Sequence, residues 1–448
     1  MAAGGFSRRD LLKIGGGIVV GLALGYGFSQ LTRPAAEVVT PSGTETLTPS
    51  QTRSAGGPKK SVVKIAVVTF TTGAASVFGV PAANMARLMA DFINQRGGIN
   101  GARVELDIRD ESGGADQMVA LYRQLVSVGG VDVYIGLISS SDCLAVAPVA
   151  EELGTTLTVF FDCATKRLVD ERMMKKVVFR TGGTTVQDGV ALAKAVLQHK
   201  PDVKTVVGLN QDYAYGRDEW EDFITALKKL KPDVEVLDTL WTPLFTTDYS
   251  AQISKIIDLK PDLVHTSYWG PDLANFVQQA AARGLFRVTT VAFARGESML
   301  QEVGAAMPEG QIVEGPHYFE YPSASPLNKQ IVEEYRRRYG IYPPYPAYHM
   351  ANAILGVKYA IEAASMATGE DWPDLSSVSK VFERLAYLSP GDWIIMTPNH
   401  NAARGAVVGI TKSAPQYNFK VLRPYQYVPP AEINPPPDMT SKEWYATW

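Results

Sequence analysis

Short apolar runs alternate with helix-length amphipathic segments over most of this 448-residue chain. The apolar runs in the first part span residues 62–68, 104–108, 131–135 and 156–161. The segments with a helical pattern span residues 80–95, 116–128 and 141–153. Strands that are apolar throughout are buried on both faces, and a repeated strand–helix–strand order predicts a parallel sheet covered by helices on both sides.

The same alternation resumes further along and predicts a second lobe of similar design. Its strands are expected at residues 205–209, 234–237, 263–266 and 289–292. Its helices are expected at residues 187–199, 249–259 and 273–283, and further helices follow at 328–339 and 348–364. The length of the chain also exceeds what one core usually supports, so the expected fold class is α/β with two doubly wound parallel-sheet lobes.

The first 31 residues have the pattern of an export signal. Residues 7–13, Ser-Arg-Arg-Asp-Leu-Leu-Lys, match the twin-arginine pattern, and the apolar, Gly-rich span 14–28 follows. That span is shorter than the roughly 20 residues of a typical membrane helix. No cysteine follows for a lipid anchor, and no clear cleavage site stands beyond residues 32–36, so an uncleaved membrane tether is the alternative. Residues 32–60 are rich in Thr, Ser, Pro and Gly, which predicts a flexible linker.

Composition narrows the classes of function. A net charge of −3 argues against binding to a nucleic-acid backbone. The five histidines and two cysteines show no metal-ligand spacing, and no nucleophile elbow or phosphate-binding loop follows the first strand, so we expect no metal, no cofactor and no enzyme activity. Four acids in the strand-to-helix loops are interpreted as helix caps or ligand contacts rather than a catalytic pair: Asp142, Asp162, Asp212 and Asp272.

Five stretches, in order, resemble one family. They are "INQRGGINGARVELDIRDESG", "YIGLISSSDCLAVAPVAEELG", "DYAYGRDEWEDF", "TTDYSAQISKIIDLKPDLV" and "YGIYPPYPAYHMANAI". They are similar to the extracytoplasmic solute-binding proteins of ABC transporters, in the branched-chain amino acid, amide and urea group with the type I periplasmic-binding-protein fold. The resemblance covers residues 62–425. It implies two lobes joined by three hinge segments, with the ligand held between them.

The resemblance also implies where the lobes begin and end. We place the crossings near residues 179–181, 315–317 and 390–392. Lobe one is then residues 61–180 plus 317–389, and lobe two is residues 181–316 plus 390–428. Residues 429–448 are interpreted as a Pro-rich tail, either extended on a surface or disordered.

In lobe one the candidate ligand contacts follow the strands. Ligands of open α/β sheets bind beyond the carboxyl ends of the strands, where free N–H groups at helix starts attract negative charge. These loops hold the ligand in the family that the chain resembles. The candidates are Thr72, Ser140, Ser141, Ala164 and Thr165. The alternative is that their hydroxyls only cap helices.

In lobe two the resemblance implies an aromatic jaw. Tyr215 matches the position that closes over the ligand, with Tyr213 close by, and Trp269 falls where amino-acid-binding relatives carry an aromatic residue. Those relatives place a carboxylate for the ligand's α-ammonium group in the loop that here contains Phe293 and Arg295. A buried arginine instead favours a carboxylate or another planar anion.

The two cysteines, Cys143 and Cys163, lie in neighbouring loops of this face. Export permits a disulfide. Because Cys143 sits just inside a predicted helix, the geometry disfavours the bond, and we expect two small buried thiols with pairing as the alternative.

The expected function is an extracytoplasmic receptor that captures a small polar organic solute (an amino acid, amide or carboxylate) and delivers it to an ABC-type permease. Ligand contacts with both lobes would shift the population to a closed form that the permease recognises. The alternative is a ligand sensor that signals through a protein partner.

Overall fold

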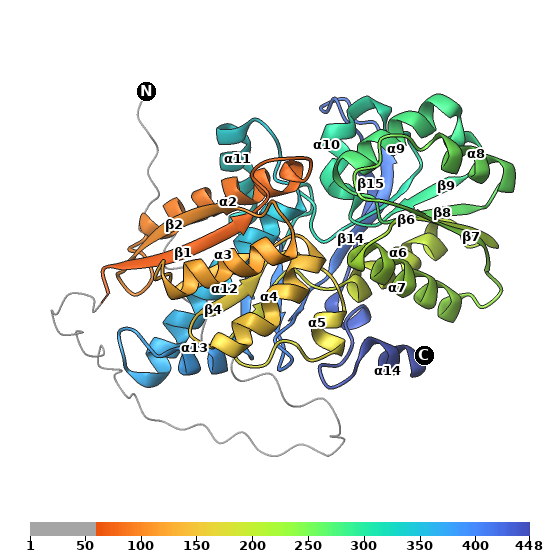
Figure 1. The fold of residues 1–448 in the computed structure, drawn as a ribbon. Coiled ribbons are helices and arrows are strands. Elements are labelled where there is room, and N and C mark those ends of the chain that lie inside the picture. Colours follow the sequence, from red (N-terminus) through yellow and green to blue (C-terminus); the bar gives the residue numbers. More distant parts are fainter. Residues whose placement is uncertain (1–59) are drawn as a thin grey trace, which may run out of the picture. The chain divides into compact units, whose positions relative to one another are not determined.

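The computed structural model describes residues 60–448, which belong to one compact unit (Figure 1). The predicted signal and nearly all of the predicted linker lie outside the described residues. Between residues 60 and 448, no helix combines the length and the apolar character needed to cross a membrane.

Lobe one is built on a five-stranded parallel sheet with the order β2-β1-β3-β4-β5. The strands are β1 (Val62–Thr69), β2 (Arg103–Asp110), β3 (Val133–Gly136), β4 (Leu157–Phe160) and β5 (Val178–Arg180). In β1, Ile65 is paired with Leu106 on one side and with Val133 on the other. Its central place in the sheet explains the continuous apolar run from which the sequence predicts it.

Helices cover both faces of this sheet, because alternate strand residues point to opposite sides. One core contains Ile65 and Val67 and includes residues of α2 (Ser76–Asn94), α12 (Tyr345–Thr368) and α13 (Leu375–Phe382). The other contains Ala66 and Val68 and includes residues of α3 (Ala115–Ser127) and α4 (Ser140–Leu153). Helix α11 (Leu327–Tyr339) adds Ile331 and Tyr335 to the first core.

Lobe two is built on a seven-stranded sheet with the order β15-β14-β10-β9-β8-β6-β7. Five strands are parallel: β6 (Thr205–Gln211), β7 (Glu235–Thr242), β8 (Leu263–Thr266), β9 (Thr290–Phe293) and β10 (Ile312–Gly315). The prediction of a parallel sheet is confirmed for these five strands, and the sheet continues with β14 (Ala406–Lys412), antiparallel to β10, and β15 (Val421–Val428), antiparallel to β14. These two strands follow each other directly, and strands without a crossover helix between them pair antiparallel.

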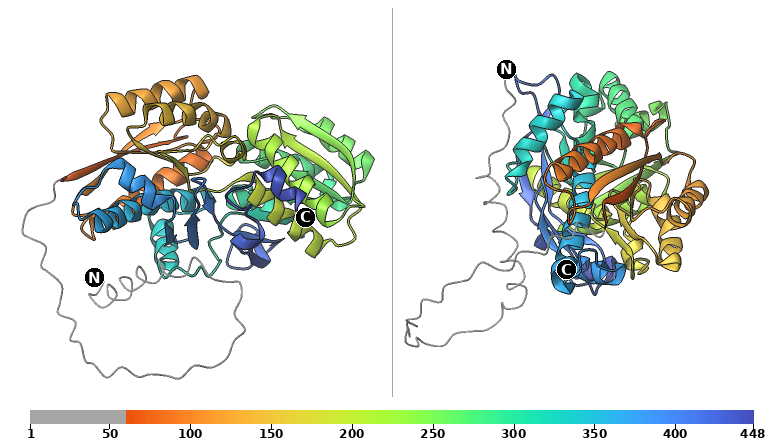
Figure 2. Two further views of the ribbon diagram at one scale, coloured as in Figure 1. Left: turned by 90° about the horizontal axis from the view of Figure 1, so that it is seen from below. Right: turned by 90° about the vertical axis from the view of Figure 1, so that its left-hand side faces the viewer.

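The helices of lobe two also form two layers (Figures 1 and 2). Residues of α6 (Thr185–His199) and α7 (Ala214–Leu230) share one core with Val206, Ala292 and Val408. Residues of α8 (Ser250–Leu259) and α9 (Gly270–Arg283) share the other with Val207, Val264 and Val291. The ligand-side loops therefore emerge from a sheet fixed on both faces.

The third crossing lies later than predicted. Residues 390–392 form the turn between β11 (Ala386–Leu388) and β12 (Trp393–Met396), which are antiparallel. Ile394 and Met396 are buried in the core of lobe one, as is Ala402 in β13 (Ala402–Ala403). The chain therefore passes to lobe two at residues 404–405, just before β14 begins.

The last 20 residues are folded rather than extended. They contain a 3-10 helix (Pro430–Glu432) and the short helix α14 (Ser441–Ala446), which lies against α7 (Figures 1 and 2). The backbone N–H of Ser441 donates to Asp170 at 2.9 Å, and its hydroxyl donates to the same carboxylate at 2.5 Å. Tyr445 is buried and donates to Asp222 of α7 at 3.3 Å. Asp170 belongs to α5 (Arg167–Asp170), so this segment contacts elements of both lobes.

The expectation of two free thiols is also wrong. Cys143 and Cys163 form a disulfide, with their Cα atoms 6.6 Å apart. Cys143 occupies the first turn of α4, and that turn lies beside the loop that follows β4. The position inside a helix therefore does not separate the two side chains as we expected.

Candidate ligand-binding site

A cavity of ≈ 300 Å³, its open mouth included, lies among the loops that follow β3, β4, β6, β8 and β9. Both lobes contribute to it. Its lining residues are Phe78, Ile138, Ser140, Asp162, Ala164, Tyr213, Tyr215, Trp269, Arg295 and Tyr345. Six of them are residues that the sequence put forward as ligand contacts: Ser140, Ala164, Tyr213, Tyr215, Trp269 and Arg295.

The other four candidates lie outside the lining. The Thr72 hydroxyl donates to Asp110 at 2.5 Å, and Ser141 is exposed one residue beyond the cavity-lining Ser140. The Thr165 hydroxyl donates to Asp218 in lobe two at 2.5 Å. Phe293 ends β9 and is fully buried in a core of lobe two.

Five aromatic side chains form the walls of the cavity. Phe78 from α2 meets Trp269 edge to face, with ring centroids 5.3 Å apart, and Tyr345 at 5.9 Å. The Trp269 indole N–H donates to the Tyr213 hydroxyl at 2.7 Å, and the Tyr213 and Tyr215 rings are 6.0 Å apart. These contacts fix flat apolar surfaces around the space, which suits a planar or apolar ligand body.

Arg295 supplies the positive charge of the cavity. Its Nε donates to Asp188 Oδ2 at 2.7 Å, and its Nη1 donates to Asp162 Oδ1 at 3.0 Å. Nη2 is buried and has no hydrogen-bond partner in the described part of the chain. Burial opposes the charge, but the attraction of Asp188 and Asp162 outweighs it and raises the pKa of Arg295 well above its usual value. The guanidinium therefore remains charged and keeps one N–H edge for an acceptor.

The backbone around Arg295 explains its orientation. Arg295 has φ of 52°, in the left-handed region, at the end of the loop after β9. Its backbone N–H donates to Glu314 Oε2 on the neighbouring strand β10 at 2.9 Å. The Glu314 carboxylate thus stabilises a left-handed backbone conformation that is unfavourable for a residue other than glycine.

Asp162 faces Arg295 from lobe one and is only 1% exposed. Its Oδ1 also lies 2.8 Å from Nδ1 of His349, whereas Oδ2 has no partner among the described residues. Burial raises the pKa of Asp162 to about 6, although Arg295 acts in the opposite direction. Burial lowers the pKa of His349 well below its usual value, so this histidine is neutral and donates from Nδ1.

A second arginine connects this group to the hinge. Arg404, at the third crossing, donates from Nη2 to Asp188 Oδ1 at 2.5 Å and from Nε to the carbonyl of Gly182 at 2.6 Å. Gly182 lies in the first crossing, between β5 and α6. The ion pair of Arg295 and Asp188 is therefore attached to two of the three connections between the lobes.

The lobes touch each other at the polar rim as well. Lys166, in the loop after β4 of lobe one, donates to Glu221 at 2.8 Å and to Asp222 at 3.0 Å, both on α7. The bond between Thr165 and Asp218 lies in the same contact. The structure is thus a form in which residues of both lobes meet around the cavity.

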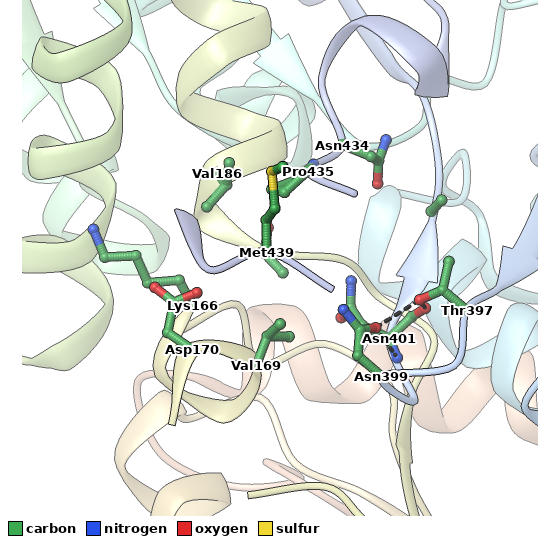
Figure 3. A pocket seen from close by; sticks show the side chains of 12 residues that line it. Lys166, Val169, Asp170, Val186, Thr397, Asn399, Asn401, Asn434, Pro435 and Met439 are labelled. Atoms are coloured by element: carbon green, nitrogen blue, oxygen red, sulfur yellow. Dashed lines mark hydrogen bonds between the residues drawn. The ribbon is translucent and has the colours of Figure 1, made fainter. Parts of the chain in front are cut away.

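A second cavity of ≈ 390 Å³ lies between the hinge and the C-terminal segment (Figure 3). Met439 stands among its lining residues, and Thr397 donates to the carbonyl of Asn401 at 2.7 Å. Asp170 accepts from Ser441, and Asn434 donates to the carbonyls of Arg404 and Pro430. Because these polar groups already have hydrogen-bond partners within the protein, this cavity offers a ligand fewer free polar contacts than the aromatic cavity does.

Four lining residues are not among the ten candidate contacts. Asp162 was interpreted as a helix cap or a contact with a polar ligand group, and Phe78, Ile138 and Tyr345 were not singled out. Tyr345 lies within the family-like stretch "YGIYPPYPAYHMANAI", and Phe78 starts the helix after the first ligand-side loop. These two positions in the sequence were the features from which Tyr345 and Phe78 could have been put forward as contacts.

Two α/β lobes, three crossings and an aromatic cavity between the strand ends define a two-lobed solute-binding protein. The family model described as "Periplasmic binding protein" matches residues 62–409. The chain therefore belongs to the periplasmic binding protein family. Membership in that family implies a location outside the cytoplasm, and the named relatives are binding proteins rather than enzymes.

Among curated proteins, the chain is similar to the leucine-, isoleucine-, valine-, threonine-, and alanine-binding protein of Pseudomonas aeruginosa. The two are 26% identical over 308 residues, which cover 67% of this chain and 79% of the relative. A Leu/Ile/Val-binding protein homolog of Brucella melitensis is 27% identical over 270 residues, 57% of this chain and 67% of the relative.

Solved structures share the fold. A solute-binding protein of an ABC transporter from R. palustris, in complex with benzoate, has a TM-score of 0.71 at 19% identity and covers 82% of this chain and 97% of its own. A leucine-binding protein of Thermotoga maritima has a TM-score of 0.69 at 23% identity and covers 83% of this chain and 100% of its own. These similarities establish the type I periplasmic-binding-protein fold of the chain.

Proposed function

We propose that this protein is an extracytoplasmic receptor that captures a small organic carboxylate, preferentially an aromatic one, and delivers it to an ABC-type permease. The observation that carries the proposal is the unpaired Nη2 of Arg295 at the polar end of a cavity with aromatic walls. A buried guanidinium N–H without an acceptor is costly, and a ligand carboxylate would supply the acceptor.

The rest of the cavity supports the same ligand. Ser140 Oγ accepts the N–H of Thr165 at 3.2 Å, so its own hydroxyl proton is available for a ligand oxygen. Phe78 and Trp269 lie on opposite lobes and meet edge to face, so a flat ring that packs against this pair would contact both lobes at once. Contact with both lobes is what favours the closed form.

The comparisons favour transport and offer two ligand classes. One solved neighbour is in complex with benzoate, and the Pseudomonas aeruginosa relative is named for binding leucine, isoleucine, valine, threonine and alanine. The relatives with stated functions are binding proteins, which favours delivery over the sensor alternative. We further propose export through the twin-arginine route, for which the pattern of residues 1–31 is the support, and a signal retained as a membrane tether is the alternative.

A neutral amino acid is the second candidate. Asp162 Oδ2 has no partner among the described residues and could accept a bond from an ammonium group. However, an amino acid would have to place its carboxylate against Arg295 and its ammonium group against Asp162, although these two side chains are bonded to each other at 3.0 Å. A simple carboxylate with an apolar body needs less rearrangement.

A thermal-shift screen with benzoate, 4-hydroxybenzoate, leucine, urea and benzamide tests the proposal. A ligand present at one hundred times its dissociation constant adds about 2.7 kcal/mol of stability. We expect shifts with the two benzoates and their loss in Arg295→Lys, which retains the charge but loses the planar N–H edge. Arg103→Ala, which removes an exposed arginine, is the control. A shift with leucine alone, unaffected by Arg295→Lys, would contradict the proposal.

A further inference from the structure

Arg295 and Asp162 are paired at 3.0 Å beside the cavity, and each has one atom without a partner in the described part of the chain. Among residues 60–448, Nη2 of Arg295 lacks an acceptor and Oδ2 of Asp162 lacks a donor. Both residues line the cavity and both are more than nine-tenths buried. A ligand that satisfies both atoms must accept one hydrogen bond and must share a proton with Asp162.

Arg295 already carries two carboxylates. Asp188 binds its Nε, and Asp162 binds its Nη1. A ligand carboxylate at Nη2 would be a third, next to the ionised Asp162, in a space from which most water is excluded. Like charges at such short distance cannot all remain ionised in a buried site.

Of the acids paired with Arg295, Asp162 is the one whose protonation state we expect to change. The ionisable groups that face it from the surrounding elements are Arg295 after β9, Asp188 on α6, Arg404 before β14, His349 and Tyr345 on α12, Tyr213 before α7 and Glu111 after β2. Asp188 is held by two arginines, which keep its pKa below the usual value. Asp162 has only one arginine and a neutral histidine.

We propose that Asp162 couples ligand capture to proton uptake: a carboxylate ligand binds Arg295 together with one proton from solvent, which Asp162 carries on Oδ2 and donates to the ligand oxygen. This inference rests on the proposed function, because it requires a carboxylate as the ligand. The covalent bonds of the ligand do not change, and only the proton is taken from solvent.

The titration of Asp162 sets the pH range. Burial raises its pKa to about 6 in the structure without ligand, so the group is mostly charged at pH 7. A bound anion raises that pKa further, because it favours the neutral form. Above about pH 6 the dissociation constant of a carboxylate ligand should therefore rise by up to tenfold per pH unit. Below that range it should level off, because Asp162 is already protonated.

The test is calorimetric titration of the wild-type protein with benzoate at several pH values between about 5.5 and 8, in buffers of different ionisation enthalpy. Benzoate remains ionised over this range, because free carboxyl groups titrate near pH 4. We expect uptake of close to one proton per benzoate at pH 7.5 and a dissociation constant that rises at least tenfold between pH 6 and 8. Benzamide, a neutral analogue of similar shape, should bind without proton uptake.

Two variants locate the effect. Asp162→Asn retains an oxygen for Arg295 and carries a permanent N–H donor, so it should bind benzoate with little dependence on pH and at least tenfold more tightly than the wild type at pH 8. Asp142→Asn is the matched control, since burial also raises the pKa of Asp142 to about 6 but its side chain does not line the cavity. This control should retain the pH dependence of the wild type.

The outcomes separate this inference from the proposed function. Benzoate binding with a constant affinity and no proton uptake would overturn the role of Asp162 and leave the receptor function intact. Equal loss of pH dependence in Asp142→Asn would also overturn it. Failure of benzoate and 4-hydroxybenzoate to bind at any pH would overturn the proposed function and this inference together.

Discussion

Arg295 donates from Nε to Asp188 Oδ2 at 2.7 Å, and both side chains are buried. The same carboxylate accepts from Arg404 at the third crossing. One aspartate therefore orients the arginine of the ligand cavity and attaches it to the hinge. In the proposed function, ligand binding and lobe closure would therefore share this ion pair.

Asp188→Ala should cost about 3–5 kcal/mol of unfolding free energy, because it leaves two buried guanidinium groups with fewer partners. Urea denaturation measures this loss. Asp212→Ala is the control, since Asp212 forms an exposed pair with Arg217 that contributes at most about 1 kcal/mol. A loss in Asp188→Ala no larger than in the control would show that the pair does not hold the site.

Trp269→Ala should weaken ligand binding by about tenfold to a hundredfold, or about 1.4 to 2.8 kcal/mol. It removes the wall that contacts Phe78 of lobe one and the donor to the Tyr213 hydroxyl. Calorimetric titration gives the affinity. Trp393→Ala removes a half-exposed tryptophan far along the chain on β12 and should leave the affinity unchanged. Equal affinities in the two variants would exclude Trp269 from the site.

Stability should fall as the pH rises from about 5 to 8. Burial raises the pKa of Glu297 and of Glu314 to about 8, well above that of an exposed glutamate. These groups are protonated in the folded protein and charged in the unfolded chain across this range, so the unfolded state binds fewer protons. Each contributes a loss of about 1.4 kcal/mol per pH unit, which begins near the unfolded pKa and ends near pH 8.

Glu297→Gln should make the fall of the unfolding free energy with pH less steep, by the contribution of one glutamate. Urea unfolding at intervals of one pH unit measures this change. The amide keeps an oxygen for the backbone N–H of Tyr345, which donates to Glu297 at 3.0 Å. Glu309→Gln changes a carboxylate whose pKa is lowered by bonds from Ser413, and should leave the slope above pH 5 as it is. An unchanged slope in Glu297→Gln would mean that Glu297 is not protonated in the fold.

Loss of the disulfide should cost about 3 kcal/mol, because Cys143 and Cys163 are 20 residues apart and the bond restricts the unfolded chain. The Cys143→Ala/Cys163→Ala variant, compared with the oxidised wild type, gives this value. Alkylation under non-reducing, denaturing conditions should find no free thiol in the exported protein. Two alkylated cysteines would restore the expectation of free thiols.

Most of the architecture could be predicted from local pattern. The run at residues 62–68 is apolar because β1 is an interior strand with parallel neighbours on both sides, and residues 263–266 match β8 for the same reason. The third crossing could not be placed in this way. Residues 390–392 have the composition of a hinge turn, but they join β11 to β12, and only the burial of Ile394 and Met396 in lobe one shows it.

The site was predictable where a residue faces the cavity directly from a strand-to-helix loop. Tyr215 and Trp269 were put forward because they match aromatic positions of the family that the chain resembles. Thr165 stays a predicted ligand contact, and its hydroxyl binds Asp218, which lies 53 residues away in the sequence, so local pattern could not show this bond. Asp162 was interpreted as a cap or a general polar contact, because its pairing with Arg295 joins positions 133 residues apart.

The most direct test of the receptor function is calorimetric titration of benzoate and of leucine into the wild type and into Arg295→Lys at about pH 6, where both states of Asp162 are populated. The account predicts that benzoate binds with a stoichiometry of one and that Arg295→Lys weakens it at least tenfold, or about 1.4 kcal/mol. Saturable binding of leucine without binding of benzoate, or benzoate binding that Arg295→Lys leaves unchanged, would contradict it.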